Sequence, residues 1–280
     1  MSDIDLVVPY VDMNDENWIE LAKQNNIRIQ KERFRGQGDF FKYFFRCIDK
    51  NLPWINNLFL IVQSDSQVPE FIDKSKIKII KHEDFIPKEF LPVYSSCTIE
   101  MFLQNIPGLS EHFLYFNDDV FVIKPLLRTQ FFIEDKVCQS FTDRFPIGIY
   151  GNHVKNGCRL IFGNDYVVSM NHSIKTLLKS KCIECFNIYK NEILNSISKT
   201  RTEFNFNVYL FSFYLKKIGK TTKSKIHNSL YFRNTPRCLN SKFNQVVCIN
   251  DDGSNLSVYD NEELNNWFKN NFKDKSKYEK

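Results

Sequence analysis

Short apolar runs alternate with helical patterns over the first half of this 280-residue chain. The strand-like runs are IDLVVPYV (4–11), NLFLIVQ (57–63), IKIIKH (77–82) and HFLYF (112–116). The helical patterns occupy residues 15–31, 40–53 and 95–109. Runs of this length, rich in β-branched and aromatic residues, are typical of buried strands. Their alternation with helices favours an α/β layered domain with a mainly parallel sheet.

The alternation of strand-like and helical runs weakens after about residue 126. We predict irregular strands and loops at 133–142 and 147–163, and helix at 170–198. A strongly apolar helix closed by Gly219 is predicted over 204–220, and an amphipathic helix from 261. Without an internal repeat or a Pro- or Gly-rich linker, we expect one domain. Its parts are an α/β core (1–126) and a mixed, mainly helical second part (127–280).

Charge and cysteine content narrow the classes of protein. A net charge of +5 and a pI near 8.6 suit an acidic or phosphorylated substrate, whereas the dispersed Lys and Arg argue against nucleic-acid binding. The eight cysteines and the start MSDIDLVVPY, which lacks the pattern of a signal peptide, predict free thiols and a cytoplasmic location. Cys182 and Cys185 form a lone CxxC, better explained as two incidental helix thiols than as a zinc site.

Two adjacent carboxylates interrupt a strand-like run at HFLYFNDDVFV. Asn117, Asp118 and Asp119 come directly after the strand predicted at 112–116. Ligands gather at the carboxyl ends of strands in α/β sheets, and carboxylates there can hold Mg²⁺. The alternative is an Asp-rich turn before a hairpin, which is disfavoured by the apolar flanks.

Other polar groups follow the same logic. Asp12 ends the first strand, where a carboxylate cluster could join the one at Asp118, although Asp-rich loops are common. Arg33 and Arg35, beside two glycines, could pair with phosphate, and Arg46 follows on the next helix. Two exposed arginines near a turn remain the alternative.

Three later candidates have weaker signals. His172 could act as a base, although a lone histidine is more often structural. Arg201 precedes an apolar helix and could equally be a surface charge. Asn250 and Asp251, in CINDDGSN, repeat the Asn-Asp-Asp theme and could equally form a glycine turn.

The chain closely resembles the Stealth family over most of its length. The second and longest family segment is similar to RFRGQGDFFKYFFRCIDKNLPWINNLFLIVQSDSQVPEFI and HEDFIPKEFLPVYSSCTIEMFLQNIPGLSEHFLYFNDDVFV. IDLVVPYVDMND resembles the first segment, MNHSIKTL through RTEFNFNVYLFSFYL the third, and NQVVCINDDGSN the fourth. The members of the Stealth family are bacterial capsular polysaccharide phosphotransferases, related to the animal enzyme that places N-acetylglucosamine-1-phosphate on lysosomal glycans.

The resemblance implies a Rossmann-like catalytic domain, akin to the GT-A-like fold of metal-dependent glycosyltransferases. In it, residues 1–126 would be the nucleotide-sugar-binding core, and residues 127–280 would complete the active site. It implies transfer of a sugar-1-phosphate from a nucleotide sugar to a glycan hydroxyl, with release of a nucleoside monophosphate. Matched by position, its functional residues fall on Asp12, Asn117, Asp118, Asp119, His172, Arg201, Asn205, Asn250 and Asp251. Tyr10 and Met13 replace the usual Trp and Gly, Ser95 the usual Asn, and Asn205 a common acid.

The hypothesis from residues and resemblance together is a phosphoryl transfer that depends on positioning and charge. Mg²⁺ (or Mn²⁺) would be held by Asp118, Asp119 and Asp251, and phosphate charge would be neutralised by Arg33, Arg35 and Arg201. Either His172 or Asp12 would be the base.

Two other function classes compete with this hypothesis. A metal-dependent glycosyltransferase of the GT-A type would release a nucleoside diphosphate, and a non-catalytic glycan-binding module would release no nucleotide. The expected partners are a nucleotide sugar and a glycan acceptor. A lipid-linked acceptor would place the protein at the inner face of the cell membrane, which the basic tail KNNFKDKSKYEK could touch.

Overall fold

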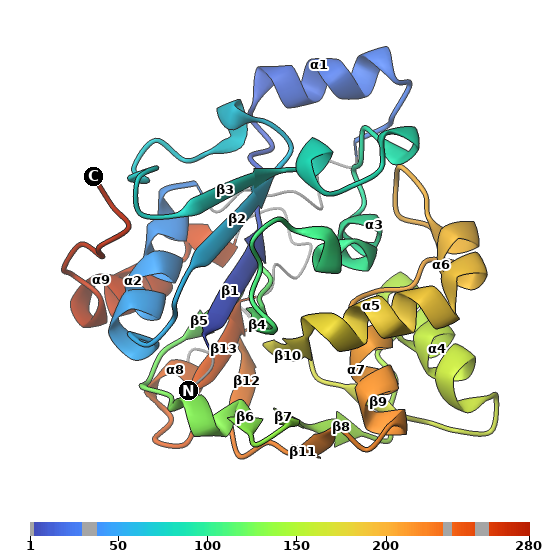
Figure 1. Ribbon diagram of the computed structural model, residues 1–280. Coiled ribbons are helices and arrows are strands. Elements are labelled where there is room, and N and C mark those ends of the chain that lie inside the picture. Colours follow the sequence, from blue (N-terminus) through green and yellow to red (C-terminus); the bar gives the residue numbers. More distant parts are fainter. Residues whose placement is uncertain (1–2, 30–37, 232–236, 250–257) are drawn as a thin grey trace.

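The computed structural model describes residues 3–29, 38–231, 237–249 and 258–280, and a five-stranded sheet lies at its centre (Figure 1). The strand order is β10–β4–β1–β2–β3. These strands are β1 (Ile4–Pro9), β2 (Leu58–Val62), β3 (Lys78–Lys81), β4 (His112–Tyr115) and β10 (Lys175–Leu178). β4, β1, β2 and β3 run parallel, and β10 runs antiparallel to β4. The predicted α/β class with a mainly parallel sheet is confirmed.

Side chains alternate between two buried faces of this sheet. In β1, Leu6 and Val8 enter one core cluster, while Val7 enters the other. Such runs are apolar on both faces because helices cover both sides of a parallel sheet. Figure 1 shows α2 (Lys42–Asn51) and α9 (Glu262–Asn271) on one side of the sheet. The helices from α4 (Gly148–Phe162) through α7 (Tyr209–Lys217) lie on the other side.

The remaining helices are short and have identifiable ends. They are α1 (Glu16–Gln24), α3 (Ser96–Met101), α5 (Lys179–Ile188), α6 (Lys190–Ser196) and α8 (Arg237–Asn240). The Asp15 carboxylate caps α1 by accepting from the Asn17 N–H at 2.9 Å. The helices predicted at 40–53, at 204–220 and from 261 are confirmed as α2, α7 and α9. Gly219 ends α7 with φ of 72°, a left-handed conformation that favours glycine.

Smaller sheets complete the second half. One contains β12 (Asn228–Tyr231), β13 (Val246–Ile249) and β5 (Val120–Val122), and another contains β11 (Thr221–Lys223), β7 (Lys136–Gln139) and β6 (Phe132–Ile133). β8 (Phe141–Thr142) pairs with β9 (Ser169–Met170). The β13–β5 pairing places Cys248 opposite Val120, directly after the Asn-Asp-Asp segment.

One predicted element is wrong, and another is right only in its second part. Residues 147–163, predicted to be irregular, contain the whole of helix α4. Its glycines hid the helical pattern, and they serve packing: a Cβ on Gly151 would lie 1.8 Å from the Pro146 carbonyl oxygen, and one on Gly157 would touch the α7 backbone. The helix predicted at 170–198 is confirmed from Lys179 onward as α5 and α6, whereas the range begins with the end of β9, a turn and strand β10, which completes the sheet edge.

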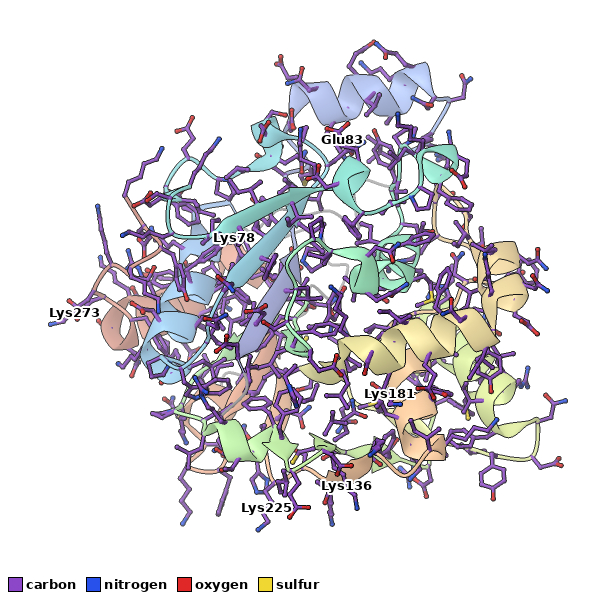
Figure 2. The ribbon with its side chains drawn as sticks, in the orientation of Figure 1. Lys78, Glu83, Lys136, Lys181, Lys225 and Lys273 are labelled. Carbon is purple, nitrogen blue, oxygen red and sulfur yellow. The ribbon has the colours of Figure 1, made fainter. Side chains whose placement is uncertain are left out.

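Charged side chains occur on several parts of the surface. In Figure 2 the labelled side chains of Lys78, Lys181 and Lys273 come from separate parts of the molecule, whereas Lys136 and Lys225 lie near each other in that view. β3 is the outermost strand at one edge of the sheet, and it begins and ends with lysine. None of the described helices is both long and apolar enough to cross a membrane.

Candidate active site

The reversed direction of β10 brings His172 to the carboxyl end of β4. Lys175, the first residue of β10, pairs with Tyr115, the last residue of β4. His172 therefore lies at the sheet edge where Asp118 and Asp119 follow β4. Its Nε2 lies 3.2 Å from Oδ1 of Asp119, although the two residues are 53 positions apart. The structure thus brings together two of the predicted site residues.

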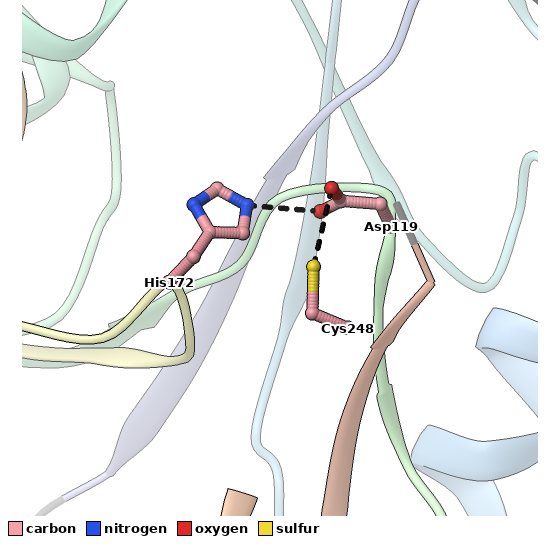
Figure 3. Close-up of side chains that lie close together, drawn as sticks. All are labelled: Asp119, His172 and Cys248. Carbon is pink, nitrogen blue, oxygen red and sulfur yellow. Dashed lines mark hydrogen bonds and ion pairs between the residues drawn. The ribbon is translucent and has the colours of Figure 1, made fainter. Parts of the chain in front are cut away.

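Cys248 completes a cluster around the Asp119 carboxylate (Figure 3). Its thiol donates to Oδ2 of Asp119 at 3.4 Å, while His172 contacts Oδ1. One oxygen, nitrogen or sulfur atom from each of the three residues lies within 4.8 Å of the others. Burial, together with the Asp119 charge, raises the pKa of the Cys248 thiol well above its usual value. The thiol is therefore held in its protonated form.

The neighbouring carboxyl groups differ in acidity. Burial, and then the charge of Asp119, raises the pKa of Asp118 to about 7. For Asp119, burial acts in the same direction, but the charge and hydrogen bond of His172 outweigh it and lower its pKa. Asp119 is therefore an ionised partner of His172, and Asp118 is a carboxyl group whose ionisation a nearby cation would favour.

A pair of hydrogen-bonded tyrosines lies on the opposite side of the His172 ring, and one of them contacts it. The Tyr150 hydroxyl, from α4, lies 3.0 Å from Nδ1 of His172. It is also hydrogen-bonded to the Tyr209 hydroxyl, from α7. Tyr209 in turn donates to the Asn171 carbonyl at 3.0 Å. Helices α4 and α7 of the second half therefore contact the segment before β10 that places the His172 ring at the sheet edge.

Asp12 and Asn117 lie at the same edge, at the ends of β1 and β4. The backbone N–H of Asp12 donates to Gln67 Oε1 at 2.8 Å, and its carboxylate accepts from the Asn14 N–H at 2.9 Å. Burial of the Tyr10 hydroxyl, and then the charges of Asp12 and Asp118, raises the pKa of Tyr10. Both carboxylates therefore act on one side chain. Asn117 is half-buried, and its carbonyl accepts from Val120 N–H at 3.1 Å.

Arg201 reaches the site region through α3. Its guanidinium hydrogen-bonds the Ser96 hydroxyl. The buried Glu100, one turn further along α3, accepts from the Tyr115 hydroxyl at 2.9 Å and the Val208 N–H at 2.7 Å. Burial raises the pKa of Glu100, against the opposing charges of Arg201 and His172. Arg201 and His172 therefore lie in the electrostatic range of one buried carboxyl group.

Two predicted binding residues have their polar atoms occupied within the protein. Asn205 is buried, accepts from the Thr202 N–H at 2.7 Å, and donates to the Ser196 carbonyl and the Ser198 hydroxyl. It thereby shapes the loop that carries Arg201. Arg46 forms two hydrogen bonds of 2.8 Å to the Glu279 carboxylate and also donates to two carbonyls of the C-terminal segment. Both geometries describe structural contacts.

Four predicted residues lie outside the described residues. They are Arg33, Arg35, Asn250 and Asp251.

The cluster of Asp119, His172 and Cys248 does not fit a magnesium ion. Mg²⁺ takes oxygen ligands, whereas two of these three groups offer nitrogen and sulfur. The Cys248 thiol donates to Asp119, so a metal that accepts sulfur would have to displace the thiol proton in order to bind here. Asp118 fits a hard cation better, since it is a half-buried carboxyl group whose neighbour repels its charge.

Sequence reasoning missed several residues of this site. Glu100, Tyr150, Lys175, Tyr209 and Cys248 were not predicted to belong to it. Tyr150 fell in a stretch predicted as loops, and Tyr209 in an apolar helix where a tyrosine has the pattern of a core residue. For Cys248 a signal existed, because it directly precedes the Ile-Asn-Asp segment that resembles the fourth family segment.

Known proteins support the family resemblance. The model of Stealth protein conserved region 2 matches residues 33–140. A capsular polysaccharide phosphotransferase of Neisseria meningitidis is 31% identical over 245 residues, which cover 78% of this chain and 66% of that protein. The chain belongs to the Stealth family. An exopolysaccharide phosphotransferase of Lactiplantibacillus plantarum is 42% identical over 141 residues (48% of this chain, 40% of that protein).

This Stealth-family chain matches only part of several relatives. It spans 40% of the Lactiplantibacillus plantarum protein and 59% of a receptor polysaccharide phosphotransferase of Streptococcus gordonii, to which it is 34% identical over 63% of its own length. Among solved structures, a galactosyltransferase bound to donor and acceptor sugar analogues aligns over 95% of both chains, with a TM-score of 0.44 and 11% identity. That likeness is too loose to carry a conclusion.

Proposed function

We propose that this protein transfers a sugar-1-phosphate from a nucleotide sugar to a glycan hydroxyl and releases a nucleoside monophosphate. The observation that carries the proposal is the contact between His172 and the ionised Asp119 at the carboxyl edge of the sheet. Ligands of α/β sheets bind at this edge. The names of the relatives, which are polysaccharide phosphotransferases, agree with it.

His172 is proposed as the base that accepts the proton of the attacking hydroxyl. It lies against a carboxylate and is about a quarter exposed, so an acceptor hydroxyl has access to it. Asp12, the alternative base, accepts a hydrogen bond from its own loop. We place Asp12 and Asn117 on the donor side of the site, at the ends of β1 and β4.

Charge on the donor requires positive groups. Arg201 is proposed to contact phosphate oxygens, because among the described residues its guanidinium hydrogen-bonds only the Ser96 hydroxyl, which a phosphate could replace. Arg33 and Arg35 remain proposed phosphate contacts. Asp118 would hold a divalent ion such as Mg²⁺ or Mn²⁺, with Asp251 as a further proposed ligand. When bound, that ion would neutralise charge on the donor diphosphate.

The acceptor and its location follow from the same proposal. A growing surface glycan on a lipid would bring the protein to the inner face of the membrane. Lys273, Lys275 and Lys277 lie in the C-terminal segment that Arg46 holds against α2. We propose this segment as the contact with anionic headgroups.

The nucleotide released decides the function. The purified protein would be incubated with UDP-, CMP- and GDP-linked sugars, Mg²⁺ and a glycan acceptor, and the nucleotide products identified. Release of a monophosphate is expected. A diphosphate would show glycosyl transfer instead, and no release by wild type would remove the enzymatic proposal.

A matched pair of variants connects the reaction to the site. We expect Asp119→Asn to lose about 10²-fold or more in rate, because it removes the charge that supports His172. Asp274→Asn, an exposed change in the C-terminal segment, should retain wild-type rate. Equal rates in the two variants would contradict the assignment of the site.

A further inference from the structure

A hollow that is partly open to solvent lies beside the segment that carries His172. Asn171 and Ser173, the residues on either side of His172, both line it. Consecutive Cα atoms are about 3.8 Å apart, so the hollow lies close to the proposed base. The rest of its lining comes mainly from the ends of β7, β10 and β12 and from the segment between β11 and β12. We call it the β10 hollow.

The lining of the β10 hollow is mostly neutral and polar. The Ser140 hydroxyl and the Asn228 amide belong to it, and both residues are half-buried. Within the described ranges neither side chain has a hydrogen-bond partner. Hydroxyl and amide groups both donate and accept, which suits the hydroxyls of a sugar. Met170, Ile174 and Ile226 add apolar surface, which suits the C–H groups on the faces of a sugar ring.

Gln139 adds a buried acceptor that has no donor. It is the last residue of β7, lines the hollow and is 3% exposed. Its Nε2 donates to the Thr176 carbonyl at 2.8 Å and to the Ser212 hydroxyl at 3.0 Å. Its Oε1 lacks a hydrogen-bond partner in the described part of the chain. An unmet buried acceptor is costly, and a hydroxyl of a molecule in the hollow could supply the missing donor.

The same hollow is poorly suited to phosphate. Lys175 is the one charged side chain among its described lining residues, and it is only 2% exposed. Its Nζ donates to the carbonyls of Asn171 at 3.0 Å and Ser173 at 2.7 Å, and it lies 4.2 Å from the centre of the Tyr209 ring. Phosphate is recognised by cations and N–H groups that are free to pair with its oxygens. A neutral ligand therefore fits this hollow better than a diphosphate does.

The order of the strands separates the β10 hollow from the side on which we place the donor. β4 lies between β1 and β10 in the sheet. Asp12 follows β1 and Asp119 follows β4, whereas the hollow borders β10. A donor at the ends of β1 and β4 would have the hollow on its far side, next to His172.

We propose that the β10 hollow binds a neutral sugar residue of the acceptor glycan and presents the attacking hydroxyl to His172. Its partly open form leaves room for the glycan chain to continue into solvent. This inference rests on the proposed function and adds to it the place where the second substrate binds.

The first test measures sugar binding without a donor. Saturation-transfer difference NMR would use methyl glycosides of glucose, galactose, mannose and N-acetylgalactosamine. We expect at least one to bind wild type, and Ser140→Ala and Asn228→Leu each to weaken that binding by about 3- to 10-fold, because each removes one neutral hydrogen bond. Thermal unfolding shows that each variant is folded, and the two substitutions come from different strands.

The matched control is Thr222→Val. This nearly isosteric change removes a hydroxyl from β11, at a half-buried residue that is outside the lining of the hollow. It should bind the glycosides as wild type does. Absence of binding to wild type, or equal binding by wild type and both hollow variants, would overturn the inference.

The second test distinguishes the two sources of a sugar, because the donor also contains one. Nucleotide release would be measured with the glycoside that binds best as the acceptor. Both hollow variants should raise KM for the acceptor by about 3- to 10-fold and change KM for the donor by less than about twofold. A raised KM for the donor with an unchanged KM for the acceptor would assign the hollow to the sugar of the donor and overturn the inference.

The inference and the proposed function fail in different experiments. The binding test needs no reaction, so it decides the role of the hollow even if wild type releases no monophosphate. Monophosphate release by wild type, together with unaltered glycoside binding in both hollow variants, would overturn the role of the hollow alone.

Discussion

Asp118 and Asp119 are adjacent, yet their surroundings give the two carboxyl groups opposite tendencies. Asp119 contacts His172, and its pKa is lowered despite its burial. For Asp118, burial and the negative charge of Asp119 both favour the protonated form, and together they raise its pKa to about 7. Two acids with separated affinities for protons are a common feature of catalytic sites.

Asp118 should make stability depend on pH. Its folded pKa of about 7 exceeds the ordinary aspartate value of about 3.9, so the folded state binds the proton more tightly. Its stabilising contribution is complete below about pH 4 and is lost as the pH rises through 7. We therefore expect Asp118→Asn to gain stability relative to wild type between pH 5 and 8, on the order of 2 kcal/mol after screening. Urea unfolding at both pH values measures it. Parallel pH profiles would contradict it.

A divalent cation bound by Asp118 should offset the loss of stability that its ionisation causes at high pH. At pH 8, Mg²⁺ that binds the folded protein through Asp118 raises the unfolding temperature by mass action. We expect that rise in wild type and its absence in Asp118→Asn, measured by thermal unfolding. Sodium chloride at matched ionic strength controls for general screening. Equal stabilisation of both proteins by Mg²⁺ would exclude Asp118 as a ligand.

At the scale of elements, the loop between α6 and α7 depends on one amide. The Nδ2 of Asn205 donates to the Ser196 carbonyl and to the Ser198 hydroxyl, and its Oδ1 accepts from Thr202. Asn205→Asp replaces the donor with an oxygen that faces a carbonyl. We expect a loss of about 1–3 kcal/mol in urea unfolding, together with slower nucleotide release. Asn156→Asp, which removes a donor to the same loop from α4, should have a smaller effect because Asn156 is less buried. A fully stable Asn205→Asp would show that the loop does not need this amide.

The C-terminal segment packs onto α2 through a buried ion pair. The Arg46 and Glu279 side chains are 11% and 4% exposed. Removing one partner of such a pair leaves the other charge uncompensated, so Arg46→Ala should cost about 3 kcal/mol. Lys50→Ala, one turn further along α2, removes a surface contact to Asn271 and should cost under about 1 kcal/mol. Urea unfolding compares them. If Arg46→Ala instead keeps full stability and loses donor binding, Arg46 is a phosphate ligand as first predicted.

The parts of the fold that could be predicted share one property. β1, β2 and β4 are short runs with apolar side chains on both faces, so composition alone reveals them. The helix α4 could not be predicted, because Gly148, Gly151 and Gly157 lower helix propensity. The close approach of Gly151 to Pro146 and of Gly157 to α7 is visible only in the structure.

The site shows the same division. Asp12, Asp118, Asp119 and His172 are polar residues beside strand ends, and the family resemblance marks them. Tyr150 and Tyr209 carry no such mark, because their role depends on α4 and α7 meeting behind β10. Only coordinates show that meeting.

At the scale of the whole molecule, one sheet serves both core clusters. β1, β2 and β4 send alternate side chains into each cluster, so neither cluster can lose its packing without disturbing the other. The two parts expected from sequence, 1–126 and 127–280, are therefore proposed to unfold as one domain.

This proposal predicts coincident unfolding transitions. The chain has three tryptophans, Trp18, Trp54 and Trp267, and none lies in α4, α5, α6 or α7. Tryptophan fluorescence therefore reports mainly on the other parts of the molecule, whereas far-ultraviolet circular dichroism reports on all helices. We expect both signals to change at the same urea concentration. Separate midpoints would show that the helical half is an independent domain.

The lysines at the two ends of β3 affect how this protein meets other copies of itself in a crowded solution. An outermost strand offers unpaired backbone groups to which a second molecule could add its own strand. Such an approach would bring the ammonium groups of Lys78 and Lys81 against those of an identical neighbour. Like charges at both ends of so short a strand discourage this joining, so the side of the sheet opposite β10 is protected from self-association.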